Sequence, residues 1–220
     1  MSNIRLKNKA YFYENNFYLK SDISRLSKLI SHYEIYKKTQ SVKGDIFEFG
    51  VFKGASLIRF LSFINLFEKK NKKMVYGFDS FGKFPTNDSK RDNKFAKQHD
   101  SKIGLGISKS YLEKYLKKKK IKNFKLIKGD ICKTLPYFLS RNKNIKISLL
   151  HLDVDVFKPT NLIINLLFKK ISKNGIILVD DYSHVKGATK AIDIFLKKNK
   201  RLKIQKLKFK NRPSFIIKMN

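Results

Sequence analysis

Cysteine, tryptophan and acidic residues are scarce in this chain. Of its 220 residues, one is cysteine (Cys132), none is tryptophan and 17 are Asp or Glu, against 50 Lys or Arg. A single cysteine excludes an internal disulfide, which agrees with a reducing compartment. No neighbouring feature indicates an activated thiol at Cys132, so a cysteine nucleophile is not predicted.

Long apolar runs are also missing. The longest groups, such as residues 162–168, are far too short to cross a bilayer. Residues 1–16 have no apolar signal-peptide core. We therefore expect no transmembrane segment and a cytoplasmic protein. The hydrophobic content of 42% is enough for one substantial folded core.

The shortage of acidic residues leaves a formal net charge of +33 at pH 7. Such a charge suggests nucleic acid as a partner. However, only seven of the 50 basic residues are Arg, and the lysines are spread over the whole chain among many Asn, Ile and Phe residues. This mixture is typical of AT-rich codon usage, so solvated surface charge is favoured and nucleic acid remains a disfavoured alternative.

Strand and helix patterns alternate from residue 44 onward, after a polar, aromatic and unpatterned arm (1–20) and an amphipathic helix (22–38). The predicted strands are 45–49, 74–78, 124–127, 145–152 and 176–179, with final candidates at 202–209 and 213–218. Helices are predicted at 54–68, 109–119, 159–171 and 187–198, a helix or turn from 131, and a long irregular loop at 80–105. This alternation predicts an α/β, Rossmann-like, doubly wound and mostly parallel sheet with an antiparallel C-terminal hairpin. The predicted division is 1–43, an N-terminal arm and helix, and 44–220, the α/β domain.

Every predicted strand of the parallel part ends at a carboxylate. Ligands of an open parallel sheet bind beyond the carboxyl ends of its strands. The acidic residues at these ends are Glu48, Asp79, Asp130, Asp153 and the pair Asp180-Asp181. In a chain with so few acidic residues, this concentration predicts a carboxylate-lined cleft.

The first three strand ends suit a nucleoside-like ligand. Gly50 and Gly54 allow close approach of the backbone, yet neither GxGxxG nor GxxxxGK[ST] occurs. Glu48 suits a ligand that carries an ammonium group, although an ordinary strand-to-helix turn is an equal alternative. Asp79 accepts hydrogen bonds from ribose hydroxyls or caps a turn. Asp130 faces an adenine amino group or caps the following helix, and the cap is favoured when the residue is judged alone.

The last two strand ends predict a metal site. Adjacent strands lie about 4.8 Å apart, so Asp153, Asp180 and Asp181 converge if their strands are neighbours. Three unpaired carboxylates repel one another, and a hard divalent cation such as Mg²⁺ relieves the repulsion. His151 fits a core histidine better than a metal ligand. His184 is either an exposed residue or a proton acceptor, and both alternatives stay open.

The ordered set of motifs resembles the macrocin O-methyltransferase (TylF-type) family of class I S-adenosylmethionine-dependent methyltransferases, which methylate sugar hydroxyls. The matching segments are 48–54 (EFGVFKG), 76–81 (YGFDSF) with Pro85, Gly129-Asp130 with 134–136 (TLP), 149–155 (LLHLDVD) with Pro159-Thr160, 175–182 (GIILVDDY) and 187–193 (GATKAID). They cover about residues 44–195 in family-like order and spacing. Gly82-Lys83 and residues 156–158 depart from the family pattern near the expected acceptor pocket, so the acceptor stays open.

The resemblance implies a seven-stranded sheet and a Mg²⁺-dependent O-methyltransferase. It implies S-adenosylmethionine at Glu48, Gly50, Gly54, Asp79, Ser80 and Asp130, and Mg²⁺ at Asp153, Asp180 and Asp181. For the mechanism we predict Asp153 or His184 as the catalytic base. The expected acceptor is a hydroxyl of a sugar, sugar nucleotide or glycoconjugate, of anionic character, and a homo-oligomer is an open alternative. The competing hypotheses are a methyltransferase acting on RNA or another polyanion and a non-catalytic basic binding protein. A nicotinamide-dependent oxidoreductase is disfavoured by the missing GxGxxG.

Overall fold

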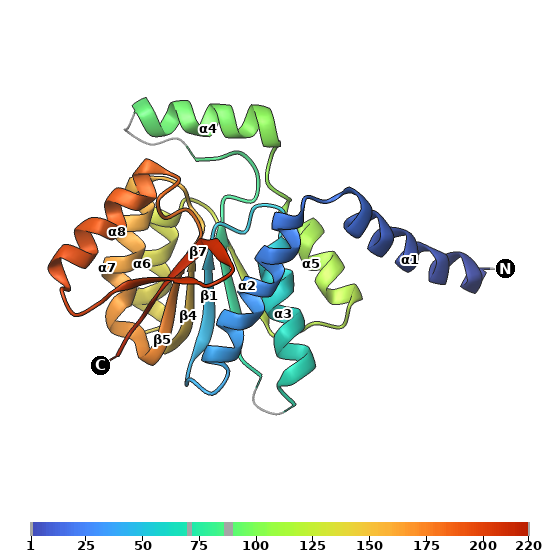
Figure 1. Cartoon of the computed structure of the whole chain (residues 1–220), viewed down its shortest axis with the longest axis horizontal. Helices are drawn as coiled ribbons and strands as arrows, with labels where there is room; N and C mark the ends of the chain where they lie inside the picture. The colour runs from blue at the N-terminus through green and yellow to red at the C-terminus, as the bar shows by residue number, and fades with distance from the viewer. Residues whose placement is uncertain (1, 70–71, 86–89, 220) are drawn as a thin grey trace.

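A seven-stranded sheet forms the centre of the computed structural model, which describes residues 2–69, 72–85 and 90–219 (Figure 1). The strands are β1 (Asp45–Phe49), β2 (Val75–Asp79), β3 (Phe124–Lys128), β4 (Ile147–Leu152), β5 (Ile171–Val179), β6 (Ile204–Leu207) and β7 (Lys210–Ile217). Their order is β3-β2-β1-β4-β5-β7-β6, with β1 to β5 parallel and β7 antiparallel to β5 and β6. The predicted mostly parallel sheet with an antiparallel C-terminal hairpin is confirmed.

Helices cover both faces of the sheet. They are α1 (Ser2–Lys20), α2 (Ile23–Thr39), α3 (Ala55–Phe67), α4 (Lys90–Ile103), α5 (Lys109–Lys118), α6 (Ile131–Arg141), α7 (Phe157–Leu167) and α8 (Lys186–Lys198), with a 3-10 turn η1 (Phe168–Lys170). One buried cluster joins α2, α3 and α5 to one face, and a second joins α6, α7 and α8 to the other. Strand β4 is buried along its whole length because helices cover it on both sides.

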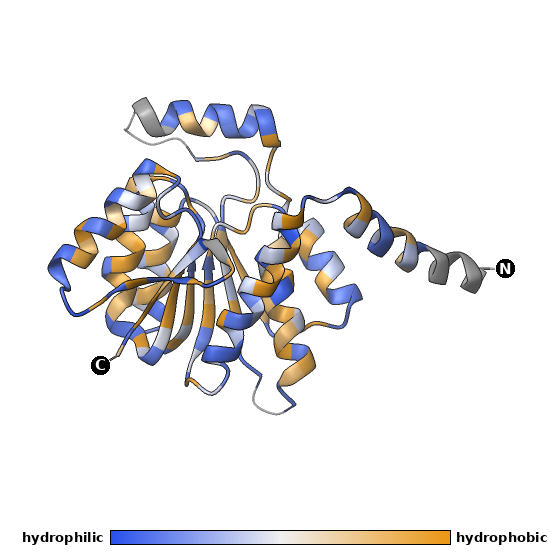
Figure 2. Ribbon diagram, in the orientation of Figure 1, coloured by the Kyte–Doolittle hydropathy of each residue, from blue (hydrophilic) through white to orange (hydrophobic). Residues whose placement is uncertain are grey.

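Two segments differ from the sequence prediction. The N-terminal arm is the helix α1, which projects from the body with Tyr11, Phe12 and Tyr13 exposed (Figures 1 and 2). Most of the predicted loop 80–105 is the helix α4, in which Ala96 is buried. Neither helix packs a wide apolar face on the sheet. Their sequences therefore lack the periodic apolar pattern by which a helix is predicted. Residues 86–89 of the predicted loop lie outside the described residues.

Helix α2 belongs to the packed body of the protein. It contacts α3, β4, β5 and β7, and it fully buries Ile35 and Tyr36. Helix α2 precedes residue 44 in the sequence, yet it packs against the sheet that follows this residue. The division of the chain at residue 44 therefore stays a prediction. No helix in the described part of the chain is long and apolar enough to cross a membrane.

Candidate active site

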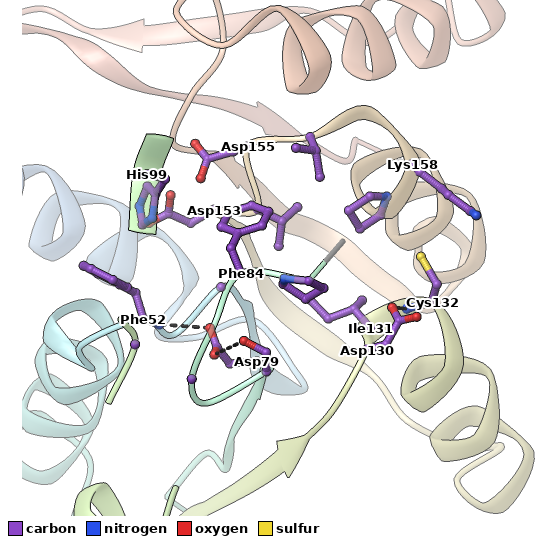
Figure 3. A pocket seen from close by; sticks show the side chains of 18 of the residues that line it. Phe52, Asp79, Phe84, His99, Asp130, Ile131, Cys132, Asp153, Asp155 and Lys158 are labelled. Carbon is purple, nitrogen blue, oxygen red and sulfur yellow. Dashed lines mark hydrogen bonds between the residues drawn. The ribbon is translucent and has the colours of Figure 1, made fainter. Parts of the chain in front are cut away.

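A cavity of about 400 Å³ opens at the carboxyl ends of β1 to β4. Its walls come from the loops after these strands and from α4, and they include Gly50, Phe52, Asp79, Ser80, Phe84, His99, Asp130, Ile131, Cys132, Asp153, Asp155 and Lys158. In the view of Figure 3, Asp153, Asp155 and His99 lie at one side, and Asp130 and Cys132 lie at the other. The cavity thus has an aspartate-rich end and a mixed end, and it lies beyond the carboxyl ends of the parallel strands.

Asp79 stabilises the loop between β1 and α3 through hydrogen bonds. Its Oδ2 accepts hydrogen bonds from the backbone N–H groups of Val51 (2.8 Å) and Phe52 (3.0 Å), and its Oδ1 accepts one from Phe81. The carboxylate therefore holds the loop in shape while it also lines the cavity (Figure 3).

The backbone of Asp153 lies so close to position 50 that only glycine fits there. Its φ is +90°, and a Cβ built there would lie 1.8 Å from the carbonyl oxygen of Asp153. Only glycine fits at this distance and adopts this φ without strain. The β1 loop and the loop after β4 are therefore pressed together, which brings the glycine turn to Asp153.

Asp130 both lines the cavity and caps a helix. Its Oδ1 accepts a hydrogen bond from the backbone N–H of Cys132 (2.9 Å) at the start of α6. Ser80 also lines the cavity, with its hydroxyl donating to the carbonyl of Lys83 (2.7 Å). Gly54 precedes α3 with a φ of +83°. Asp79, Ser80 and Asp130 are thus brought together around one cavity, as the sequence predicts.

Glu48 lies beneath this loop and does not line the cavity. Its side chain is fully buried, and its Oε1 accepts a hydrogen bond from the hydroxyl of Ser56 (2.5 Å) in the first turn of α3. Burial raises the pKa of Glu48 to about 8. It points to the α2 and α3 side of the sheet because it alternates with Phe47 and Phe49, which pack on the opposite face.

Asp153, Asp180 and Asp181 converge as the strand order predicts. One carboxylate oxygen from each lies within 4.8 Å of the other two. Asp180 and Asp181 are buried, and Asp180 Oδ1 and Asp181 Oδ2 have no hydrogen-bond partner among the described residues. Buried, unpaired oxygen atoms are costly, and oxygen donors of this kind suit Mg²⁺. The chemistry of the donor set fits the predicted metal.

Burial is the largest influence on the pKa values of this carboxylate cluster, and repulsion between neighbouring carboxylates follows. Burial, with the charges of Asp180 and Asp181, raises the pKa of Asp153 well above its ordinary value. Burial and the charge of Asp153 raise the pKa of the neighbouring Asp155 to about 7. The cluster therefore calls for positive charge, from the protein or from a ligand.

Lys28 supplies positive charge from helix α2. Its Nζ lies 2.6 Å from Asp180 Oδ2 and 3.9 Å from Asp153 Oδ2. Burial opposes the effect, but this ammonium and the nearby His151 hold the pKa of Asp180 below its ordinary value. Lys28 was not predicted as a site residue, because nothing local distinguishes it from the other lysines of the chain.

Two further histidines lie below the carboxylate cluster. His151 is fully buried, with its Nε2 3.9 Å from Asp180 Oδ1, too long for a direct hydrogen bond. His32 of α2 is also fully buried and stacks on Phe60 at 5.1 Å between ring centroids. His151 therefore lies in the core, as predicted. His32 was not predicted as a site residue because no sequence motif surrounds it.

His184 lies outside the main cavity. It is exposed after β5, and its Nδ1 lies 3.1 Å from the carbonyl oxygen of Tyr182. With Lys186, Thr189 and Asp193 it borders a separate, shallower hollow. The main cavity instead contains His99 of α4, which contacts Phe52 edge to face at 5.2 Å. His99 was missed because its segment is predicted as a loop.

The solved structures that superpose on this chain include methyltransferases. The calicheamicin methyltransferase CalS11 superposes with a TM-score of 0.71 at 22% identity, over 92% of this chain and 83% of CalS11. Another structure of CalS11, described as a TDP-rhamnose 3'-O-methyltransferase, gives a TM-score of 0.69 at 22% identity over 92% and 84% of the two chains. The O-methyltransferase NovP gives 0.71 at 20% identity over 86% and 79%. No curated protein sequence matches the chain.

The sheet order and these neighbours define the class I methyltransferase fold. The sequence itself matches the macrocin-O-methyltransferase (TylF) family over residues 23–207. The chain belongs to this family, and the prediction of an O-methyltransferase is confirmed.

Proposed function

We propose that this enzyme transfers a methyl group from S-adenosylmethionine to a hydroxyl of a sugar, sugar nucleotide or glycoconjugate, with Mg²⁺ bound beside the acceptor. The observation that carries the proposal is one continuous cavity. Asp79 and Asp130 border it after neighbouring strands, and Asp153 joins it to the carboxylate cluster.

The residues around the cavity support S-adenosylmethionine as the methyl donor. The Gly50 turn allows close approach of the donor's methionine part, and Asp79 and Ser80 offer oxygen atoms for its ribose hydroxyls. Asp130 accepts from the adenine amino group, beside the apolar side chain of Ile131. Glu48 acts from below, through Ser56 and the helix that follows the turn.

In the proposed mechanism, the chain's carboxylates orient the acceptor and accept its proton. Asp153 lines the cavity with 26% of its side chain exposed, so it is the carboxylate best placed to accept the hydroxyl proton at one of its oxygens. Asp180 and Asp181 complete the ligand set from the next strand. When bound there, Mg²⁺ supplies positive charge that lowers the pKa of the acceptor hydroxyl. His184 stays a second candidate for the base.

The proposed acceptor is a small, anionic glycoside or glycan. The net charge of +33 attracts anionic substrates over distances of about a Debye length. CalS11, which shares the fold, is described as acting on TDP-rhamnose, a nucleotide-linked sugar. A homo-oligomer and a cytoplasmic location, which suits the single cysteine, complete the proposal.

The test combines cofactor binding with a screen of acceptors. Calorimetry measures the affinity for S-adenosylmethionine, and mass spectrometry detects a gain of one methyl group on nucleotide-linked sugars and glycans in the presence of Mg²⁺. Asp153→Asn is expected to lower the turnover at least about hundredfold while the cofactor affinity stays within about threefold, since removal of a general base typically costs 10²–10⁴ in rate. Glu113→Gln, in α5 beside Lys109 and outside both hollows, is the matched control.

Metal-dependent turnover that survives in Asp153→Asn would remove Asp153 from the mechanism. Because of the high positive net charge, RNA is a second candidate for the acceptor. Methylation of RNA, with an RNA affinity that falls steeply as salt rises, would replace the sugar acceptor in the proposal.

A further inference from the structure

A lysine from outside the strand-end motifs reaches into the proposed metal site. Lys28 lies in the middle of α2, a helix that packs on the face of the sheet below the cavity. Its ammonium contacts Asp180 Oδ2 at 2.6 Å and approaches Asp153 Oδ2 to 3.9 Å. Two of the three carboxylates in the cluster are therefore already near a positive charge that belongs to the chain.

We propose that Lys28 is a built-in counter-cation that competes with Mg²⁺ for the carboxylate cluster and must withdraw from Asp180 before the metal binds. The inference rests on the proposed function, because it concerns the same metal site. It adds a regulatory element to that site: the side chain of Lys28 sets how tightly the enzyme holds its metal.

The geometry makes simultaneous binding unfavourable. Mg²⁺ requires oxygen ligands at about 2.1 Å in near-octahedral order. Asp180 Oδ2 already accepts from Lys28, and its Oδ1 is turned to the buried side, toward His151. An ammonium and a divalent cation sharing Asp180 would repel each other strongly in this partly buried position.

Lys28 is also able to leave. Its side chain is 23% exposed, so it is not sealed in the core, and lysine carries its charge on a flexible four-carbon stem. With the ammonium withdrawn, Asp180 Oδ2 becomes available as a ligand, beside Asp153 and the unpartnered Oδ2 of Asp181. While it is paired, Lys28 offsets the repulsion among the carboxylates, which lets the cluster form before the metal arrives.

The test measures metal affinity directly. Mn²⁺ binding, followed by electron paramagnetic resonance, and Mg²⁺ binding, followed by calorimetry, are compared in the full-length wild type, Lys28→Met, Lys28→Arg and Lys37→Met. Lys28→Met is expected to bind both ions at least tenfold more tightly than the wild type. Lys28→Arg keeps the charge and is expected to bind no more tightly. Lys37→Met, on the same helix beside Glu34, is expected to stay within twofold.

Unchanged or weaker metal binding in Lys28→Met would overturn the proposal, as would a complete lack of metal binding in every variant. Lys28→Gln, which is neutral and polar, provides the same comparison if Lys28→Met does not fold. S-adenosylmethionine affinity and methyl transfer in EDTA are measured on the same samples. The metal affinities alone decide the competition. Methyl transfer that persists in EDTA would remove Mg²⁺ from the proposed mechanism but preserve the methyltransferase, whereas loss of both cofactor binding and transfer would refute the proposed function itself.

Discussion

Replacing Glu48 with glutamine is expected to remove a pH dependence of folding that the buried carboxyl group imposes. Burial raises the pKa of Glu48 from 4.5 to about 8, against the opposing effect of the hydrogen bond from Ser56. The folded protein therefore retains this proton to a higher pH than the unfolded chain does. The resulting stabilisation is fully present below pH 4.5 and is lost as the pH rises to about 8.

The magnitude follows from the width of this window. Each pH unit within it lowers the free energy of unfolding by up to about 1.4 kcal/mol. Between pH 5 and pH 8 the wild type is therefore expected to lose as much as roughly 4 kcal/mol relative to a variant that does not titrate at this position. The glutamine of the variant keeps the side-chain shape and an oxygen that accepts from Ser56, so the comparison isolates the charge.

Urea denaturation followed by circular dichroism at pH 5, 6, 7 and 8 measures the difference. Glu48→Gln should gain stability over the wild type as the pH rises, and Glu14→Gln, on the exposed helix α1, should follow the wild type. If the free energy of unfolding changes with pH in the same way in Glu48→Gln and in the wild type, the reasoning is refuted. S-adenosylmethionine affinity, measured on the same variant, separately tests the predicted contact between Glu48 and the cofactor: a direct contact predicts a loss, and a supporting role from below predicts a smaller change.

Two further substitutions test the loops around the cavity. Gly50→Ala places a Cβ against the carbonyl of Asp153, and it is expected to cost at least about 3 kcal/mol of stability or to prevent folding, as seen in thermal denaturation; a change below about 1 kcal/mol would contradict the close approach. Asp130→Ala removes the cap on the N–H of Cys132, and it is expected to cost about 1 kcal/mol, a drop in Tm of about 2–4 °C. Asp130→Asn keeps the cap and should melt like the wild type, so a cofactor affinity that falls in both variants would assign Asp130 a direct contact with the ligand.

The fold was predictable because its signals are local. Buried strands such as 147–152 appear as near-continuous apolar runs, and each is followed by a polar residue at the edge of the sheet. The two helices that were not predicted, α1 and α4, lack this signal because they pack little apolar surface on the sheet. No repeating apolar pattern therefore marks them as helices in the sequence.

The candidate site was predictable in part. The order of strand-end carboxylates indicated that Asp153, Asp180 and Asp181 would meet, since parallel neighbours deliver their ends to the same edge. The direction of individual side chains was not predictable from this argument. Glu48, one residue before the end of β1, faces the helices below, and His184, past the end of β5, faces a separate hollow.

The sequence by itself thus determined the α/β architecture, the family and the row of acidic strand ends, because each is written in the order and spacing of neighbouring residues. Only the tertiary structure decided which charges meet. Lys28 and Asp180 are 152 positions apart, and they form an ion pair because α2 packs against the face of the sheet that ends in the carboxylate cluster. Packing between distant elements leaves no local pattern, so the counter-cation of the proposed metal site became visible only in three dimensions.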